Sequence, residues 1–218
     1  MKKQTDEGAK AYTPFTLKLY DWWVLGISNS YAWRCSTKEN LLPHFLQNMS
    51  ARHLDVGVGT GYYLTNAPSG SNVTLMDMNT ASLNAASARA GKSKVENKIK
   101  HDVFDPWPAQ LKNQFDSISM FFLLHCLPGA MQDKELVIEH SKMALSENGI
   151  LYGATILGDG VIHNGFGKKL MTVYNQKGIF SNIHDSEDEL RKILSKHFIN
   201  VEVIVKGVVA LYTASRKR

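Results

Sequence analysis

The chain has 218 residues, of which 44% are hydrophobic and 21% are charged, and its net charge is +5. This ordinary composition excludes a disordered, collagen-like or coiled-coil protein and predicts one large globular domain. Two cysteines, Cys35 and Cys126, are too few for a disulfide framework or a four-cysteine zinc site, so no metal is expected. Because the positive charge is dispersed along the chain, nucleic acid is not the favoured partner.

The start of the chain predicts neither secretion nor membrane contact. Met1–Lys3 is basic, but the polar Gln4–Glu7 follows in place of the apolar segment of a signal peptide. The longest apolar run, Ile118–Leu127, is far shorter than the roughly 20 residues of a membrane span. We therefore expect a cytoplasmic protein.

Residues 1–35 do not follow the alternation of strands and helices seen in the rest of the chain and are rich in aromatic residues, which predicts a helical cap or lid. Aromatic and guanidinium groups in such a cap suit stacking on a flat or cationic acceptor and pairing with a carboxylate. Amphipathic helices that only cover a sheet explain the same pattern. The candidate acceptor-binding residues are Tyr20, Trp22, Trp23, Trp33 and Arg34.

From residue 36 onward, short apolar runs alternate with helical patterns. Polar N-cap residues mark helix starts at Ser36, at Asn79 or Thr80, and at Ser186, and a further helical stripe covers 132–145. The predicted strands are 53–56, 72–77, 98–102, 115–120, 149–156, 201–205 and 208–212.

Strands separated by helices pair in parallel through right-handed crossovers. The two-residue connection Lys206–Gly207, in contrast, is short enough only for a hairpin. The sequence therefore predicts a doubly wound α/β domain over 36–218, with a mostly parallel seven-stranded sheet and an antiparallel C-terminal edge strand. Residues 157–185 are long for a strand–helix connection, and we expect a glycine-rich, mobile insertion there on the acceptor side.

The sharpest signal is the glycine-rich stretch at residues 54–61, LDVGVGTG, where a strand should hand over to a helix. Gly57, Gly59 and Gly61 would let the backbone approach a ligand closely. A dinucleotide-binding fingerprint would need glycine where the chain has Tyr62, and the Gly-Lys-Ser/Thr ending of a P-loop is absent. A phosphate-free nucleoside is the favoured ligand, and a purely structural turn is the alternative.

Asp77 supplies the second half of this site. It ends the second predicted strand, 16 residues after Gly61. A carboxylate at this place can accept hydrogen bonds from both ribose hydroxyls of an adenosine. An aspartate that only begins a turn or caps a helix is the alternative, but its spacing from the glycine loop favours the nucleoside site.

Together these residues resemble the class I S-adenosylmethionine-dependent methyltransferases, from about residue 36 to the end of the chain. LDVGVGTG is similar to the first motif of that family, and residues 75–79, LMDMN, are similar to its acidic second motif. The segments 101–104, 115–128 and 145–151 follow in the family's order. No Asn/Asp-Pro-Pro-Tyr/Phe follows the fourth strand, so the pattern resembles the small-molecule branch and not the branch that methylates amino groups of nucleic acids.

This resemblance implies S-adenosylmethionine as the cofactor and S-adenosylhomocysteine as its product. Asp77 would hold the ribose, and Asp55 would stabilise the glycine loop or bind the amino group of the methionine portion. Phe121 also fits a core position of the fourth strand. The implied cofactor-binding residues are Asp55 and Asp77, Gly57, Gly59 and Gly61 beneath the cofactor, Met78, Asp102 and Val103 at the adenine, and Phe121 near the methionine portion.

Methyl transfer from a sulfonium is an in-line displacement, so the protein mainly has to bind and align the acceptor and to exclude water. A general base is needed only for a hydroxyl or a protonated nitrogen. His125, at the end of the fourth predicted strand, is the candidate catalytic residue because histidine titrates near neutrality. A hydrogen-bonded structural histidine is the alternative.

We therefore predict an enzyme that transfers the methyl group of S-adenosylmethionine to a small-molecule acceptor, either aromatic or cationic. Two alternatives stay open. The positive charge and the basic end of the chain would suit methylation of RNA or protein, for which RNA binding should depend steeply on salt. A non-catalytic nucleoside-binding module would bind the cofactor without methyl transfer.

Overall fold

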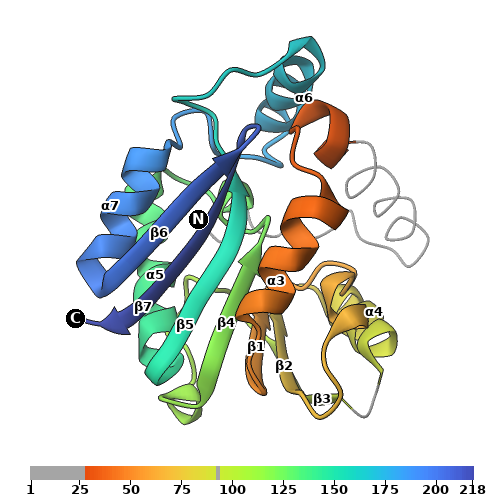
Figure 1. Ribbon diagram of the computed structural model, residues 1–218, viewed down its shortest axis with the longest axis vertical. Helices are drawn as coiled ribbons and strands as arrows, with labels where there is room; N and C mark the ends of the chain where they lie inside the picture. The colour runs from red at the N-terminus through yellow and green to blue at the C-terminus, as the bar shows by residue number, and fades with distance from the viewer. Residues whose placement is uncertain (1–27, 92–93) are drawn as a thin grey trace.

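The computed structural model describes residues 28–91 and 94–218, whose strands build one sheet (Figure 1). In chain order the strands are β1 (Arg52–Val56), β2 (Asn72–Asp77), β3 (Val95–Lys100), β4 (Phe115–Phe121), β5 (Leu145–Ile156), β6 (Phe198–Lys206) and β7 (Val209–Lys217).

The sheet is mostly parallel, as predicted. Its strand order is β3-β2-β1-β4-β5-β7-β6, and all pairs from β3 to β5 are parallel. β7 runs antiparallel to both β5 and β6, and Gly207, with φ of 62°, makes the tight turn of the hairpin. The predicted seven-stranded α/β sheet is confirmed. Its antiparallel strand lies one place in from the edge, because β7 inserts between β5 and β6.

Helices cover both faces of the sheet (Figure 1). Side chains of α5 (Met131–Ala144) and α7 (Glu187–His197) join one core cluster. Those of α3 (Leu42–Asn48), α4 (Thr80–Ala90) and α6 (Gly165–Gln176) join the other. The strands alternate between the two clusters, so that in β1 Leu54 and Val56 face α5 and α7, while His53 and Asp55 face the opposite side.

The predicted helix starts are confirmed at three polar caps. The side-chain oxygens of Ser36, Asn79 and Ser186 accept backbone N–H groups of the first turn at 3.3, 2.8 and 3.3 Å. The helix that starts after Ser36 opens with a π-helical turn, Thr37–Leu41, before α3.

Several strand boundaries and one helix differ from the sequence prediction, and β6 and β7 are both longer than predicted. β3 ends at Lys100 and not at residue 102, because its partner β2 ends at Asp77, which pairs with Lys100. β5 begins at Leu145, four residues before the predicted start. α6 was not predicted, since Gly165 and Gly167 in its first turn have low helix propensity.

The predicted cap at residues 1–35 falls mostly outside the described residues, and its boundary at residue 36 stays a prediction. The predicted insertion, 157–185, contains α6. Among the helices that the structure describes, none combines the length and the hydropathy needed to span a membrane. Within 28–91 and 94–218, no three His, Cys, Asp or Glu side chains gather closely enough to hold a metal ion.

Candidate functional site

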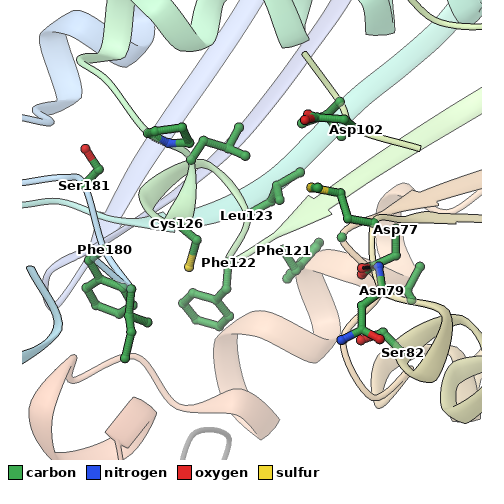
Figure 2. A pocket seen from close by; sticks show the side chains of 18 of the residues that line it. Asp77, Asn79, Ser82, Asp102, Phe121, Phe122, Leu123, Cys126, Phe180 and Ser181 are labelled. Carbon is green, nitrogen blue, oxygen red and sulfur yellow. Dashed lines mark hydrogen bonds between the residues drawn. The ribbon is translucent and has the colours of Figure 1, made fainter. Parts of the chain in front are cut away.

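A cavity of about 700 Å³ lies where the parallel strands β1, β2 and β4 end. The turns that follow these strands and β3 line it, and the segment 175–181 closes it from the other side. In an open α/β sheet this is the edge at which ligands bind. Figure 2 shows Asp77, Asn79 and Ser82 at one end of the cavity and Phe180 and Ser181 at the other.

The glycine loop forms the floor of the first end. Gly57 and Gly59 line the cavity with φ of 72° and 50°, a region that favours glycine. A Cβ added to Gly59 would meet no atom within 4 Å, so the backbone lies bare against the cavity. A Cβ at Gly61 would lie 2.6 Å from the Cα of Ala86 in α4. The third glycine therefore allows the loop to pack on α4 and does not line the cavity.

Asp77 faces the same end and is held by backbone groups. Its carboxylate accepts a hydrogen bond from the N–H of Asn79 at 2.8 Å and further bonds from the N–H groups of Gly59 and Val58. Burial raises its pKa to about 6, and these hydrogen bonds oppose the rise. The turn after β2 and the glycine loop therefore form one unit around a carboxylate that lines the cavity.

Asp55 lies deeper, only 6% exposed, and also lines the cavity. Its Oδ1 accepts a hydrogen bond of 2.5 Å from the hydroxyl of Ser119. Burial raises the pKa of Asp55 to about 7, the Ser119 bond lowers it, and the charge of Asp77 raises it. Both carboxylates can thus change protonation near neutral pH, and a cationic ligand group would favour their charged forms.

The remaining predicted cofactor residues also line this cavity. The Oδ1 of Asp102 accepts a hydrogen bond from the N–H of Phe104 at 3.0 Å, which fixes the carboxylate after β3. The structure brings together most of the predicted set, although their roles stay predictions. The lining residues from that set are Asp55, Gly57, Gly59, Asp77, Met78, Asp102, Val103 and Phe121.

The second end of the cavity is mainly apolar. The turn after β4 contributes Phe122, Leu123 and Cys126, and the segment after α6 contributes Phe180 (Figure 2). Phe122 has a φ of 59°, rare for a residue with a side chain, and its N–H donates to the carbonyl of Ala154 at 2.7 Å. Burial raises the pKa of the Cys126 thiol to about 12, so it stays protonated.

A buried ion pair anchors the segment that closes this end. The Nζ of Lys134 in α5 lies 2.6 Å from Asp185, and both side chains are at most 2% exposed. The same Nζ donates to the carbonyl of Ser181 at 2.7 Å, and the N–H of Ser181 donates to the carbonyl of His125 at 2.8 Å. The wall beside Phe180 is therefore tied to α5 and to the turn after β4.

His125 does not line the cavity, and it lies in an environment different from the predicted one. It is 2% exposed, and its ring packs edge-on against Phe180 with centroids 4.5 Å apart. Its Nδ1 accepts a hydrogen bond from the N–H of Ile156 at 3.3 Å, and burial lowers its pKa to about 3. The neutral ring then carries its proton on Nε2, and the lone pair of Nδ1 is already used by the N–H of Ile156, so neither ring nitrogen is free to take a proton from an acceptor. The geometry favours a structural role for His125.

The predicted acceptor-binding residues do not meet at the cavity in the described part of the chain. Trp33 is 1% exposed and packs behind Phe180, with ring centroids 6.1 Å apart. Arg34 donates a hydrogen bond to the carbonyl of Ile162 and does not line the cavity. Trp33 packs into the core cluster that also holds Leu170 of α6, and Arg34 is exposed outside the cavity, so a part for either residue in acceptor binding stays a prediction. Tyr20, Trp22 and Trp23 lie outside the described residues.

Several lining residues were missed by sequence reasoning. Asn79 was predicted only as a helix cap, and Ser82 lies one turn further into α4, so their closeness to Asp77 could have signalled a role. The residues after α6 lie within the insertion 157–185 that was expected on the acceptor side, but nothing in its local pattern marks them individually, because only the tertiary contacts bring them to the cavity. The missed lining residues include Tyr62, Tyr63, Asn79, Ser82, Leu123, Cys126, Ile179, Phe180 and Ser181.

Comparison with known proteins identifies the family. A family model described as a methyltransferase domain matches residues 54–151. The chain is 61% identical over 194 residues to the protein YbcY of Escherichia coli (strain K12), and the alignment covers 89% of this chain and 100% of YbcY. It is 44% identical over 216 residues to the physcion biosynthesis cluster O-methyltransferase of Aspergillus chevalieri, which covers 98% and 97%. The solved structure of the N-methyltransferase NodS from Bradyrhizobium japonicum WM9, in complex with S-adenosyl-L-homocysteine, has a similar fold, with a TM-score of 0.58, 15% identity and coverage of 81% and 83%.

Proposed function

Since this chain belongs to the class I S-adenosylmethionine-dependent methyltransferases, we propose that it methylates a hydroxyl group on a small, flat aromatic molecule. A relative with 44% identity over nearly the whole of both chains is named an O-methyltransferase, which supports a hydroxyl acceptor. The observation that carries the proposal is the contrast between the two ends of the cavity. The predicted cytoplasmic location is part of the proposal and rests on the sequence alone.

The polar end fits the cofactor. The bare backbone at Gly59 leaves room for an adenosine, the Asp77 carboxylate suits the ribose hydroxyls, and Asp102 suits the adenine amino group. Asp55, deeper in the cavity, suits the ammonium group of the methionine portion. When bound, the cofactor supplies an activated methyl group on a sulfonium.

The apolar end fits the acceptor. Phe122, Cys126 and Phe180 offer an aromatic and weakly polar surface on which a flat ring can stack. The described lining residues after β4 and after α6 include no carboxylate, while Lys177 adds a positive charge. A neutral or weakly acidic phenol is therefore favoured over the cationic acceptor that the sequence left open.

The chain's own part in the reaction is binding, alignment and exclusion of water. With the cofactor bound, a bond would form between the acceptor oxygen and the methyl carbon while the carbon–sulfur bond broke and left its electron pair on sulfur. The hydroxyl proton would pass to bulk water. A phenol, with a pKa of about 10 for tyrosine, loses this proton more easily than an alkyl alcohol. His125 is not available as a base for this proton, because its Nδ1 accepts a hydrogen bond from the N–H of Ile156 and burial keeps the ring neutral, so the phenol would lose its proton to bulk water.

The first test is binding of S-adenosylhomocysteine by thermal shift. At about 100 times its dissociation constant the ligand should add ~2.7 kcal/mol, or roughly 5–10 °C for a chain of this size. Asp77→Ala should lose most of this shift, whereas Asp188→Ala, an exposed site at the start of α7, should keep it. No shift in the unchanged protein would refute the cofactor site.

The second test identifies the acceptor. The protein is incubated with S-adenosylmethionine labelled in its methyl group and a panel of one-, two- and three-ring phenols, each with a matched aromatic amine and carboxylic acid. We expect label in aryl methyl ethers, identified by mass. Label found only in amines, or only in RNA or protein, would overturn the proposed acceptor while leaving the cofactor site intact.

A further inference from the structure

A row of buried polar side chains runs beneath the cavity on the α3 side of the sheet. His53 and Asp55 of β1 stand in register with Ser117 and Ser119 of β4. His53, Ser117 and Ser119 are fully buried, and Asp55 alone of the four lines the cavity. Burying a polar group costs free energy unless the group is hydrogen-bonded, so these four side chains should have hydrogen-bond partners.

The four side chains form one continuous chain of hydrogen bonds. The Ser119 hydroxyl donates to Oδ1 of Asp55 at 2.5 Å, and Nε2 of His53 lies 3.0 Å from the Ser119 oxygen. Nδ1 of His53 lies 2.8 Å from the Ser117 oxygen. The backbone N–H of Ser50 donates to that same oxygen at 2.8 Å and ends the chain.

The direction of every bond follows from the charge of Asp55. An ionised carboxylate only accepts, so the single hydroxyl proton of Ser119 is used on Asp55. Nε2–H of His53 must then donate to Ser119. Burial lowers the pKa of His53 to about 3, so the ring is neutral, its Nδ1 accepts, and the Ser117 hydroxyl donates to it. When Asp55 is charged, every donor in the row has a partner, and so does every acceptor atom except the second oxygen of Asp55.

We propose that His53, Ser117 and Ser119 are positioning residues, a hydrogen-bond relay that holds one oxygen of Asp55 and leaves the other directed to the ammonium group of the bound cofactor. The inference rests on the proposed function, because it needs a cationic group at that place in the cavity. A relay locked between two adjacent strands fixes the carboxylate more tightly than one mobile side chain could, since each member is held on both sides.

The groups around Asp55 determine how pH acts on the relay. Asp77 at the end of β2 raises the pKa of Asp55. Tyr152 of β5 keeps its proton, because burial and the charge of Asp55 raise its pKa well above its usual value. His44 of α3, whose ring packs edge-on against Tyr152, has its pKa lowered by burial. The Ser119 bond is the contact that lowers the pKa of Asp55, so its loss should move cofactor affinity to higher pH.

The test measures S-adenosylhomocysteine binding to the full chain by titration calorimetry from pH 6 to 9. Ser119→Ala should weaken binding about tenfold at pH 7, since a bond to a charged group is lost, and should move the pH of half-maximal affinity upward. Ser119→Thr keeps the hydroxyl and should restore both values. Ser141→Ala is the matched control, because it removes a fully buried serine hydroxyl bonded only within α5 and should change neither.

Equal affinity and equal pH dependence in Ser119→Ala and Ser141→Ala would overturn the relay. If Ser119→Ala does not fold, Ser117→Ala breaks the same chain at its far end. It should move the pH midpoint in the same direction with a smaller loss, about threefold, and an unmoved midpoint would again overturn the relay. Failure of the unchanged protein to bind the ligand would refute the proposed function itself, so the two failures are distinguishable.

Discussion

The two ends of the cavity are built by different means. At the polar end, the proposed cofactor end, most side chains come from the ends of β1, β2 and β3 and the turns that follow them, and backbone N–H groups of those turns hold Asp77. At the apolar end, the proposed acceptor end, the turn after β4 meets the segment 175–181, which begins in the last turn of α6. The first end is therefore defined by local chain geometry and the second by tertiary contacts.

Because of this difference, the two ends of the cavity place different requirements on the sequence. The cofactor end needs a few small or acidic residues at fixed distances from strand ends. The acceptor end needs an anchor between distant segments, which the Lys134–Asp185 pair and the bonds of Ser181 supply. Changes at one end should therefore leave ligand binding at the other intact.

The largest effect is expected at the cofactor end, from Gly61→Ala. The added Cβ would lie 2.6 Å from the Cα of Ala86, and the residue has a φ of 70°. The strained φ costs about 1–2 kcal/mol and overpacking about 1–3 kcal/mol, so we expect a loss of about 4 kcal/mol in the free energy of unfolding, or roughly 12 °C in thermal unfolding.

Gly59→Ala is its matched control. A Cβ there meets nothing within 4 Å, although it points into the cavity. We expect a loss of only about 1 kcal/mol in stability from its φ of 50° but a clear loss of S-adenosylhomocysteine affinity. Equal stability losses in the two variants would contradict the division of the glycine loop into a packing and a binding glycine.

At the acceptor end, Lys134→Met should cost about 3 kcal/mol, or roughly 9 °C, because it leaves Asp185 buried without its partner. Thermal unfolding measures this loss. Methyl transfer should fall with it, while S-adenosylhomocysteine affinity of the folded protein should stay within about twofold. The double variant Lys134→Met/Asp185→Leu should regain part of the stability, and no regain would contradict a direct coupling between the two side chains.

The same contrast explains how far the sequence could predict this molecule. The sheet, the terminal hairpin and the helix caps follow from periodicity and turn chemistry, which act over a few residues. The cofactor end was predictable for the same reason, since Asp55, Gly57 and Asp77 sit at strand ends whose positions the apolar runs define. Gly61 also fits the glycine-rich motif, but the structure shows that it packs on α4 and does not line the cavity.

An insertion at 157–185 was expected on the acceptor side, but the individual residues of this end could not be predicted, because they are identified only by contacts across the fold. Phe180 follows α6, which was not predicted because the two glycines in its first turn have low helix propensity. Lys134 shows no sign of burial in a helix of mixed polarity, yet it is fully buried against Asp185. The side chains of His125 and Trp33 could act on a ligand, but both are buried and pack against Phe180, which lines the cavity.

A medium effect should appear with pH at the cofactor end. Burial raises the pKa of Asp55 to about 7 and that of Asp77 to about 6. The ligand-free protein therefore loses the stability that these two groups contribute as pH rises through 6 and 7. Binding of a cationic ligand needs the charged forms, so the thermal shift caused by S-adenosylhomocysteine should grow from pH 5.5 to 8, by up to about tenfold in affinity per pH unit below the pKa.

The control for this prediction is Asp55→Asn, which should flatten the upper part of the pH dependence and leave the part due to Asp77. Thermal unfolding with and without ligand across the pH range provides the measurement. A ligand shift that is constant with pH in the unchanged protein would indicate that Asp55 does not contact the ammonium group of the cofactor and that the protonation of Asp77 does not affect ribose binding.

The smallest effect tests the strained residue at the acceptor end, Phe122. Both Phe122→Ala and Phe122→Gly remove the half-buried ring, but only glycine adopts a φ of 59° without cost. Phe122→Gly should therefore have a free energy of unfolding about 1 kcal/mol higher than that of Phe122→Ala, which raises the midpoint of thermal unfolding by roughly 3 °C. Both should bind S-adenosylhomocysteine like the unchanged protein and should raise the KM for an aromatic acceptor to the same extent. If Phe122→Ala is the more stable variant, the backbone at this turn relaxes when the ring is lost, and the ring itself, not the hydrogen bond to Ala154, holds the left-handed conformation.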